Sequence, residues 1–325
     1  MLTGASCYLL YHVLPEPFHA AGSVLEVMVS IVQPLLIFSM LFLTFCRIEP
    51  KDLKPHRWHW WLLLIQGGLF TLLGLGAFAL VKALPDDAHG LVVLIESAML
   101  CFICPTATAA AVVTRKLGGD VAGITTYTVL INLVTAVLVP LIVPLIQPVE
   151  GMTFWMAFSM IVVKIFPLLI LPCLLAWMVR YMAPKLHKWL LGFPDLAFYL
   201  WAVALTLAIA VTTRSIVKSD LAVGLLLLMA VVSLISCVLQ FFWGRYVGSR
   251  YVPRRKSELV YAEEIEKKGR AVRQVTAGQA LGQKNTVFAI WMGYTFMTPE
   301  TAIVGGLYSI WHNIYNSWQL SKVSE

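Results

Sequence analysis

A single lysine, Lys284, interrupts a long apolar stretch near the C-terminal end of the sequence. It stands between Gln283 and Asn285, and none of the next nine residues, 286–294, is charged. The nearest preceding basic residue, Arg273, lies eleven positions earlier. An ammonium group offers three hydrogen-bond donors and a positive charge, so this position is suited to hold an anion or to replace a bound cation.

Glu96, Cys101 and Cys104 lie together in a second apolar stretch. Glu96 is an acidic residue deep within this stretch, so it is the candidate partner of Lys284, with proton exchange as one use of the pair. A carboxylate that simply starts a helix is the alternative. Cys101 and Cys104 share one helical face, which fits either two small core residues or a soft-metal or metalloid site.

His312 and Asn313 belong to a polar stripe that also holds Asn316 and Gln319. Residues at these spacings share one face of a helix, and a polar face within an apolar helix turns toward a cavity or a partner helix. The stripe therefore fits a substrate site and interhelical hydrogen bonding equally well.

The composition places these residues in a membrane. The 325 residues are 59% hydrophobic and 13% charged, with a mean hydropathy of +0.81, whereas a soluble domain carries about twice that charged share. We predict an all-α polytopic membrane protein with ten transmembrane helices, or nine if residues 2–15 are peripheral. The other predicted spans are 22–45, 58–83, 91–116, 121–147, 153–180, 193–217, 221–247, 271–296 and 298–320.

The basic residues give the chain an orientation. They concentrate in one set of connections between the spans, and the opposite set holds only Lys82, Arg214 and Lys218. The positive-inside rule puts the rich set, and with it the C-terminus, in the cytoplasm. From Arg273 to Lys284 a helix rises roughly 17 Å, which is about half of the hydrocarbon core. Lys284 is thus predicted near the midplane, and a snorkelling lysine in a shifted span is the alternative.

Two spans carry signals that interrupt a helix. Pro105 removes a backbone donor within residues 91–116, and Thr106 and Thr108 beside it offer hydroxyl groups. Gly282 precedes the polar cluster around Lys284 in residues 271–296. These spans are the fourth and ninth of ten, and such a pair is typical of transporters with inverted repeats. We therefore predict two inverted five-helix repeats with a binding site near the midplane.

Four stretches resemble, in order, segments of the bile acid:sodium symporter family. FSMLFLTFCRIEPKDLKPHRW resembles the end of its second helix, CPTATAAAVVTRKLGGD its broken fourth helix, GQKNTVFA its ninth and ETAIVGGLYSIWHN its tenth. The resemblance covers residues ~22–320 and implies that the broken helices 4 and 9 cross at the midplane and that an organic anion is transported with sodium. It also implies a panel domain of about 2–45 and 153–217, a core domain of about 58–147 and 221–320, and a cytoplasmic loop at 244–272.

The sequence departs from the family where sodium binds. Sodium prefers oxygen ligands, but the resemblance places the family's ligands of helices 4 and 9 on residues without a suitable oxygen: Ala110, Ala111, Ala280 and Lys284. It places the remaining ligands on Gln66, Thr128 and Asn132. We therefore expect Lys284, near Gln66, Thr128, Asn132 and Glu96, to stand in for the ion. The alternatives are a sodium ion bound at one remodelled site and a misaligned, snorkelling lysine.

The predicted function is alternating-access transport of an organic anion, either bile acid-like or a small monocarboxylate. The expected substrate ligands are Thr106, Thr108, Gln283, Asn285, His312 and Asn313, aided by helix N-termini. No enzyme signature is present, and we expect no cofactor and no metal, with sodium or a proton as coupling ion. The expected partners are the substrate and the lipid bilayer of a bacterial inner membrane, and no nucleic acid.

Two rival functions remain open. An arsenite-type exporter that uses Cys101 and Cys104 would resemble metalloid transporters of a related fold, although in that resemblance the cysteine follows the helix-breaking proline and here Cys104 precedes Pro105. A membrane sensor that binds its ligand without transporting it is the other rival.

Overall fold

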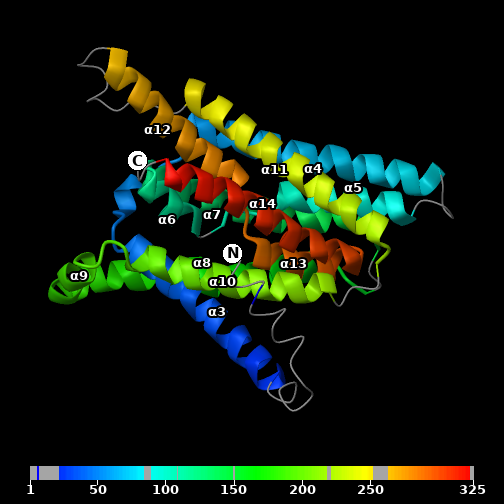
Figure 1. Ribbon diagram of the computed structural model, residues 1–325, viewed down its shortest axis with the longest axis horizontal. Coiled ribbons are helices and arrows are strands. Elements are labelled where there is room, and N and C mark those ends of the chain that lie inside the picture. The colour runs from blue at the N-terminus through cyan, green and yellow to red at the C-terminus, as the bar shows by residue number, and fades with distance from the viewer. Residues whose placement is uncertain are drawn as a thin grey trace. The chain divides into compact units, whose positions relative to one another are not determined.

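The computed structural model describes residues 22–83, 89–107, 109–148, 151–217, 221–251 and 263–322, and Ser6 alone. The predicted first span at 2–15 therefore lies outside the described residues, apart from Ser6. All described elements are helices (Figure 1). The chain divides into two compact units. The first unit comprises Met1–Pro50 and Val163–Asp220, and the second comprises Lys51–Val162 and Leu221–Glu325.

The first unit contains α3 (Gly22–Phe45), most of α8 (Phe154–Met182), α9 (Pro184–Leu191) and α10 (Leu196–Val217). Within it, α3 packs against α10, and α9 meets the start of α10 at a bend of 67°. The short α9 was not among the predicted spans. Its sequence, PKLHKWLL, holds two lysines and a histidine, which lower its hydropathy below that of a membrane span.

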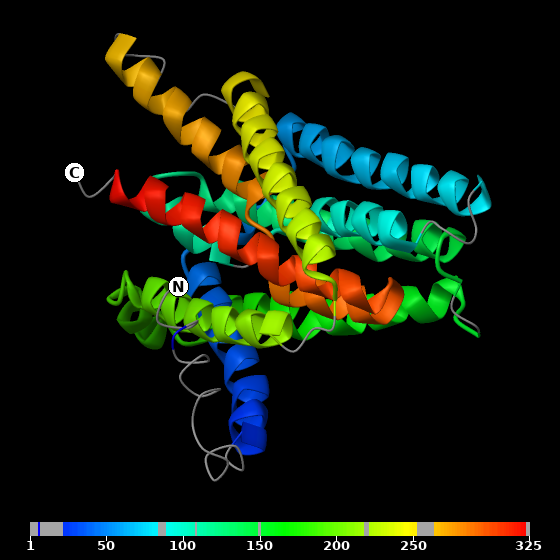
Figure 2. The same cartoon turned by 45° about the vertical axis from the view of Figure 1, so that its right-hand side comes forward.

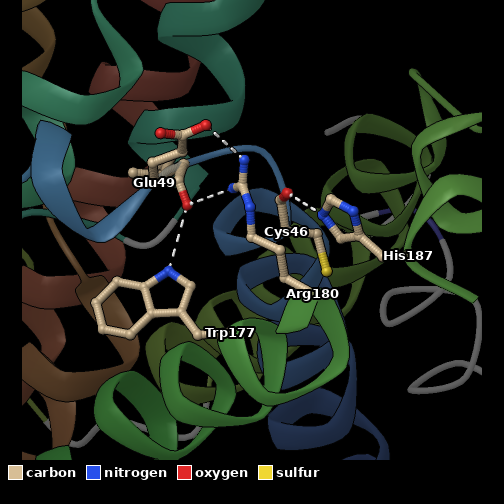
Figure 3. A network of polar contacts seen from close by, with 6 residues as sticks. Cys46, Glu49, Trp177, Arg180 and His187 are labelled. Carbon is tan, nitrogen blue, oxygen red and sulfur yellow. Dashed lines mark hydrogen bonds and ion pairs between the residues drawn. The ribbon is translucent and has the colours of Figure 1, made fainter. Parts of the chain in front are cut away.

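A polar network holds the turn that follows α3 in the first unit (Figure 3). Ile48 O accepts hydrogen bonds from Trp177 Nε1 at 3.2 Å and from Arg180 Nη1 at 3.1 Å. Arg180 Nη2 also pairs with Glu49 Oε1 at 2.9 Å, and His187 Nε2 lies 2.7 Å from the carbonyl oxygen of Cys46. Side chains of α8 and α9 thus satisfy carbonyl groups just beyond the C-terminal end of α3.

The second unit repeats one order of helices: a long helix, a broken helix and another long helix. The first set is α4 (Arg57–Ala83), α5 (His89–Ile103) with α6 (Ala109–Lys116), and α7 (Val121–Ile142). The second set is α11 (Val223–Tyr251), α12 (Glu263–Gly282) with α13 (Thr286–Phe296), and α14 (Ala302–Ser321). Single 3-10 turns, η2 (Val143–Leu145) and η4 (Pro299–Thr301), extend α7 and precede α14.

Three of the described helices are long and apolar enough to cross a membrane: Arg57–Ala83, Val121–Leu145 and Val223–Arg250. The bent pair of α9 and α10 would make a fourth. Large apolar side chains on these helices point away from the protein, for example Leu64, Leu133 and Phe242, which are 63%, 59% and 61% exposed. Exposed apolar surface of this extent suits contact with lipid chains.

The described helices follow the predicted spans closely, apart from α9 and the helix ends beside the predicted cytoplasmic loop. Within residues 244–272, α11 continues to Tyr251 and α12 already begins at Glu263, so the helices extend beyond the predicted spans. The added residues of α12, EEIEKKGR, include several strong helix formers, yet they are too polar to register as a span. Hydropathy alone therefore misses the ends of these helices.

Helices α11 and α12 pack closely in the second unit and lie side by side in both views (Figures 1 and 2). Gly244 and Gly248, one turn apart on α11, leave room for the backbone of α12: a Cβ atom on Gly244 would lie 2.5 Å from Ala277 O. Gly282 meets Phe241 in the same way, with its Cβ position 2.5 Å from the ring. Small residues at a four-residue spacing allow this approach, and it fixes where α12 ends.

Candidate functional site

The two helix breaks of the second unit are joined to each other by backbone hydrogen bonds. An isolated antiparallel bridge connects Thr106 with Lys284. Backbone groups freed by a break need a partner where water is scarce, and here each break satisfies the other. The bonds run from Ala107 N to Gln283 O at 2.8 Å and from Asn285 N to Pro105 O at 2.9 Å.

Side chains close the breaks further. Thr106 Oγ1 donates to Ala280 O at 2.6 Å, and this ties the first break to the end of α12. Asn285 caps α13, because its Oδ1 accepts from Phe288 N at 3.2 Å. Two of the predicted substrate ligands, Thr106 and Asn285, are thus engaged in holding the crossing, while Thr108 lies outside the described residues.

The C-terminal end of α5 is capped by side chains from four different elements. The last carbonyl groups of a helix lack intrahelical partners and carry partial negative charge. In α5 they accept from α11, from the α12–α13 break, from α7 and from α4. The bonds are Gln240 Nε2 to Cys101 O at 3.2 Å, Lys284 Nζ to Phe102 O at 3.3 Å, Thr135 Oγ1 to Ile103 O at 3.0 Å and Gln66 Nε2 to Cys104 O at 2.9 Å.

Lys284 is buried, with 2% of its surface exposed. Lys284, Cys101, Cys104 and Tyr308 also line a cavity of about 10 Å³, close to the space that one water molecule requires. A helix end and thiols therefore surround the ammonium group.

Glu96 is not brought to Lys284. Its Oε2 accepts instead from Thr298 N at 3.0 Å, at the connection between α13 and α14. The lysine thus finds its compensating charge in the dipole of α5 rather than in a carboxylate.

An apolar cluster fills the region where the resemblance places oxygen ligands. Ala110, Ala111 and Ala280 are 0%, 5% and 0% exposed and belong to one cluster with Leu63 and Ile124. Such a cluster offers no ligand for a hard cation.

The chain matches the profile of the Sodium Bile acid symporter family over residues 34–219, which is more than half of its 325 residues. The protein belongs to this family. It is accordingly an integral membrane transporter, as the apolar helices of both units also indicate. The comparison with curated proteins found no match. The matched residues end before α11, so Gln240 and Lys284 lie beyond them.

Three predicted cation ligands of this family member serve other bonds. Gln66 Oε1 accepts from Tyr127 Oη at 2.7 Å, so both ends of its amide are used. Thr128 Oγ1 donates to Ile124 O, and Asn132 Nδ2 donates to Thr128 O at 2.7 Å, both within α7. The structure thus brings Gln66 to the α5 end that Lys284 also caps, but it directs the two α7 side chains along their own helix.

Polar atoms remain available on α14 and at the second break. Among the described residues, three buried atoms of predicted substrate ligands have no hydrogen-bond partner: Gln283 Oε1, His312 Nδ1 and Asn313 Oδ1. Asn313 Nδ2 donates within its helix to Ser309 O at 2.7 Å, and the His312 ring stands edge-on to Tyr308 at 5.6 Å. Among the described residues of the predicted substrate site, these atoms form no other hydrogen bond and are available to a ligand.

Sequence reasoning missed Gln240 and Tyr308. Gln240 Nε2 lies 3.2 Å from Tyr308 Oη, and this hydroxyl donates to Gly282 O at 2.8 Å. The pair occupies the same places as Gln66 and Tyr127, with the glutamine on the first long helix and the tyrosine on the last, but here the amide donates to the hydroxyl group. Gln240 was detectable as a polar residue inside the apolar span 221–247, whereas Tyr308 gave no signal.

Proposed function

We propose that the protein is a secondary transporter of an organic anion, in which Lys284 occupies the place of a transported sodium ion. The observation that carries the proposal is the contact of Lys284 Nζ with Phe102 O at 3.3 Å, at the C-terminal end of the broken helix α5. The partial negative charge of a helix C-terminus favours a cation. A lysine supplies a cationic group that stays at this place, because it is part of the chain.

The neighbouring residues support this exchange of an ion for a side chain. A sodium site needs several oxygen ligands, and Ala110, Ala111 and Ala280 instead make the region apolar. A cation that cannot leave keeps the two breaks bonded throughout the transport cycle. If sodium does not bind, the ion that couples transport is then the proton.

The anion would lie on the other side of the crossing. Helix N-terminal ends attract negative groups, and Asn285 caps one such end, the start of α13. Gln283, His312 and Asn313 would add hydrogen bonds through the buried atoms that have no partner among the described residues. The proposed substrate class is a bile acid-like anion or a small monocarboxylate.

The proposed architecture is the ten-helix inverted repeat, with the second unit as the moving core and the first as the panel. The recurrence of a long, a broken and a long helix in the second unit supports it. We further propose a bacterial inner-membrane location with the C-terminus in the cytoplasm, because the basic residues concentrate on that side.

Thermal unfolding of the purified protein across a sodium titration, against choline at equal ionic strength, tests the proposal. A ligand that binds the folded state raises its melting temperature. We expect no sodium-specific shift for the wild type, and a shift after Lys284→Gln is combined with Ala280→Glu. Lys82→Gln, which removes an exposed lysine, is the matched control. A sodium-specific shift in the wild type would instead favour one remodelled ion site.

Export of a metalloid is the rival function, and the two cysteines of the site allow it to be tested. Cys101 and Cys104 are both buried next to Lys284, and Cys104 Sγ donates to Asn285 O at 3.0 Å. The organic-anion proposal expects transport to survive replacement of both cysteines by serine. Loss of arsenite transport in that variant, with a stable fold, would favour the exporter.

A further inference from the structure

Glu96 is a buried carboxyl group whose polar contacts are incomplete. It is 1% exposed on α5, and its Oε2 accepts a hydrogen bond from Thr298 N at 3.0 Å. Its Oε1 has no partner among the described residues. No basic side chain of the described residues forms an ion pair with it; the ion pair found in that part of the chain joins Arg180 and Glu49.

Charge around Glu96 gives it no compensation. The titratable groups on the elements that pack against α5 are Arg57, His59 and Lys82 on α4, Cys237, Arg245, Tyr246, Arg250 and Tyr251 on α11, Tyr294 on α13, Glu300 on η4, and Tyr308, His312 and Tyr315 on α14. Lys284, between α12 and α13, bonds the far end of α5 at Phe102 O. Glu300 has the same sign as Glu96, and an ionised carboxylate buried without a counter-charge is strongly disfavoured, whereas the neutral acid is not.

Glu96 also stands at a junction of three helix ends. Thr298 receives a hydrogen bond from Gln147 Nε2 at its hydroxyl, at 3.0 Å, in addition to giving its N–H to Glu96. Thr301 Oγ1 donates to Thr298 O at 2.6 Å. The connection between α13 and α14 is thereby tied to α5 through Glu96 and to the residues after η2 through Gln147.

A small cavity adjoins this junction. Gln147, Val139, Pro140 and Phe296 are among the residues that line it, and its volume of about 20 Å³ is enough for one water molecule. Gln147 therefore touches both the cavity and Thr298. Gln147 and Thr298 thus connect the cavity to the carboxyl group through two hydrogen bonds.

We propose that Glu96 is the proton-binding group that couples transport. This inference rests on the proposed function. Because Lys284 there takes the place of sodium, a different coupling ion is required, and Glu96 would bind it. A hydronium ion that reaches Glu96 gives its proton to Oε1: a new O–H bond forms, the carboxylate charge of −1 is neutralised and a water molecule remains. The reverse step returns the proton to water on the opposite side of the membrane.

The coupling follows from the two charge states. The neutral acid fits the closed junction seen here, since it needs no counter-charge. The ionised group needs water, and it therefore favours a conformation in which the Thr298 junction opens. Uptake and release of the proton are thus linked to the position of α13 and α14, which carry the second half of the crossing and the unpartnered polar atoms of His312 and Asn313.

Infrared difference spectroscopy of the purified full-length protein tests the protonation directly. We expect an acid-minus-alkaline spectrum with a C=O stretching band of a buried carboxylic acid, absent in Glu96→Gln and retained in the matched control Asp52→Asn, which removes an exposed carboxyl group. The glutamine keeps an oxygen for Thr298 N, so it preserves the junction. A band that survives in Glu96→Gln, or no such band in the wild type, would overturn the proposal.

Proteoliposomes that enclose a pH-sensitive dye give the second measurement, with taurocholate as the probe. We expect the protons moved per taurocholate to fall to the background of empty liposomes in Glu96→Gln and to stay unchanged in Asp52→Asn. Full proton movement in Glu96→Gln, or a sodium-specific melting shift that this substitution abolishes, would show that Glu96 is not the proton site. A wild type that moves no taurocholate would count against the bile acid-like substrate of the proposed function, and the infrared result would still decide on Glu96.

Discussion

Lys284 Nζ lies 3.3 Å from the carbonyl oxygen of Phe102, so a cation from one broken helix caps the end of the other. Replacement of Lys284 by methionine removes the donor and leaves that carbonyl buried without a partner. An unsatisfied buried group of this kind destabilises a protein by about 1–3 kcal/mol. We expect Lys284→Met to lower the melting temperature in detergent, and Lys82→Met, at an exposed position, to leave it unchanged. Equal melting temperatures for the two variants would contradict the capping role.

Gln66 and Tyr127 act as a pair, because the tyrosine hydroxyl donates to the amide oxygen while the amide nitrogen caps α5. We predict that Gln66→Leu and Tyr127→Phe are non-additive, with a coupling energy of about 0.5–3 kcal/mol. A double-mutant cycle of unfolding free energies measures it. Gln240→Leu with Tyr308→Phe tests the corresponding pair, and strict additivity in both cycles would show that the contacts carry no stability.

The ring of Phe241 leaves no space for a side chain at Gly282. A methyl group at Gly282 would lie 2.5 Å from the phenylalanine ring, so Gly282→Ala forces a shift in α11 or α12. Overpacking of this kind destabilises by about 1–3 kcal/mol. We expect Phe241→Leu to restore part of the loss when it is combined with Gly282→Ala. If the second substitution brings no recovery, the glycine is needed for its backbone and not for space.

Arg180 and Glu49 are expected to differ in importance although they form one ion pair. The pair is partly exposed, with side-chain exposures of 21% and 37%, so its own contribution is small, about 0–1 kcal/mol. Arg180 also caps Ile48 O. We therefore predict that Arg180→Ala lowers thermal stability clearly more than Glu49→Gln does. Losses of the same size would assign the effect to the ion pair alone.

Hydropathy predicted most of the helices. The expected span 22–45 coincides with α3, and 58–83 differs from α4 by one residue. The breaks were also predictable: Pro105 lacks a backbone donor, and Gly282 stands before a polar cluster, so both departures from a regular helix have a local cause. Helix α9 and the polar ends of α11 and α12 escaped notice, because they lie outside the apolar pattern that reveals a span.

The contacts of the site were much less predictable. The four donors that cap α5 come from four separate elements, and no spacing in the sequence shows that they converge on one helix end. Glu96 was expected near Lys284 as its counter-charge, but it bonds Thr298, 202 positions away. Composition reveals that a buried charge needs a partner, whereas only the packing of the helices decides which partner it finds.

The bond between the two breaks has a consequence for how the protein is made. Ala107 and Gln283, which share a backbone hydrogen bond, are separated by 176 residues, 283 minus 107. At a synthesis rate of about 5–20 residues per second, the first break waits roughly 9–35 s for its partner to leave the ribosome. During that time its freed backbone groups have to be sheltered by the translocation machinery or by water. A nascent chain that stops short of Gln283 is consequently a candidate for rapid clearance by membrane quality control.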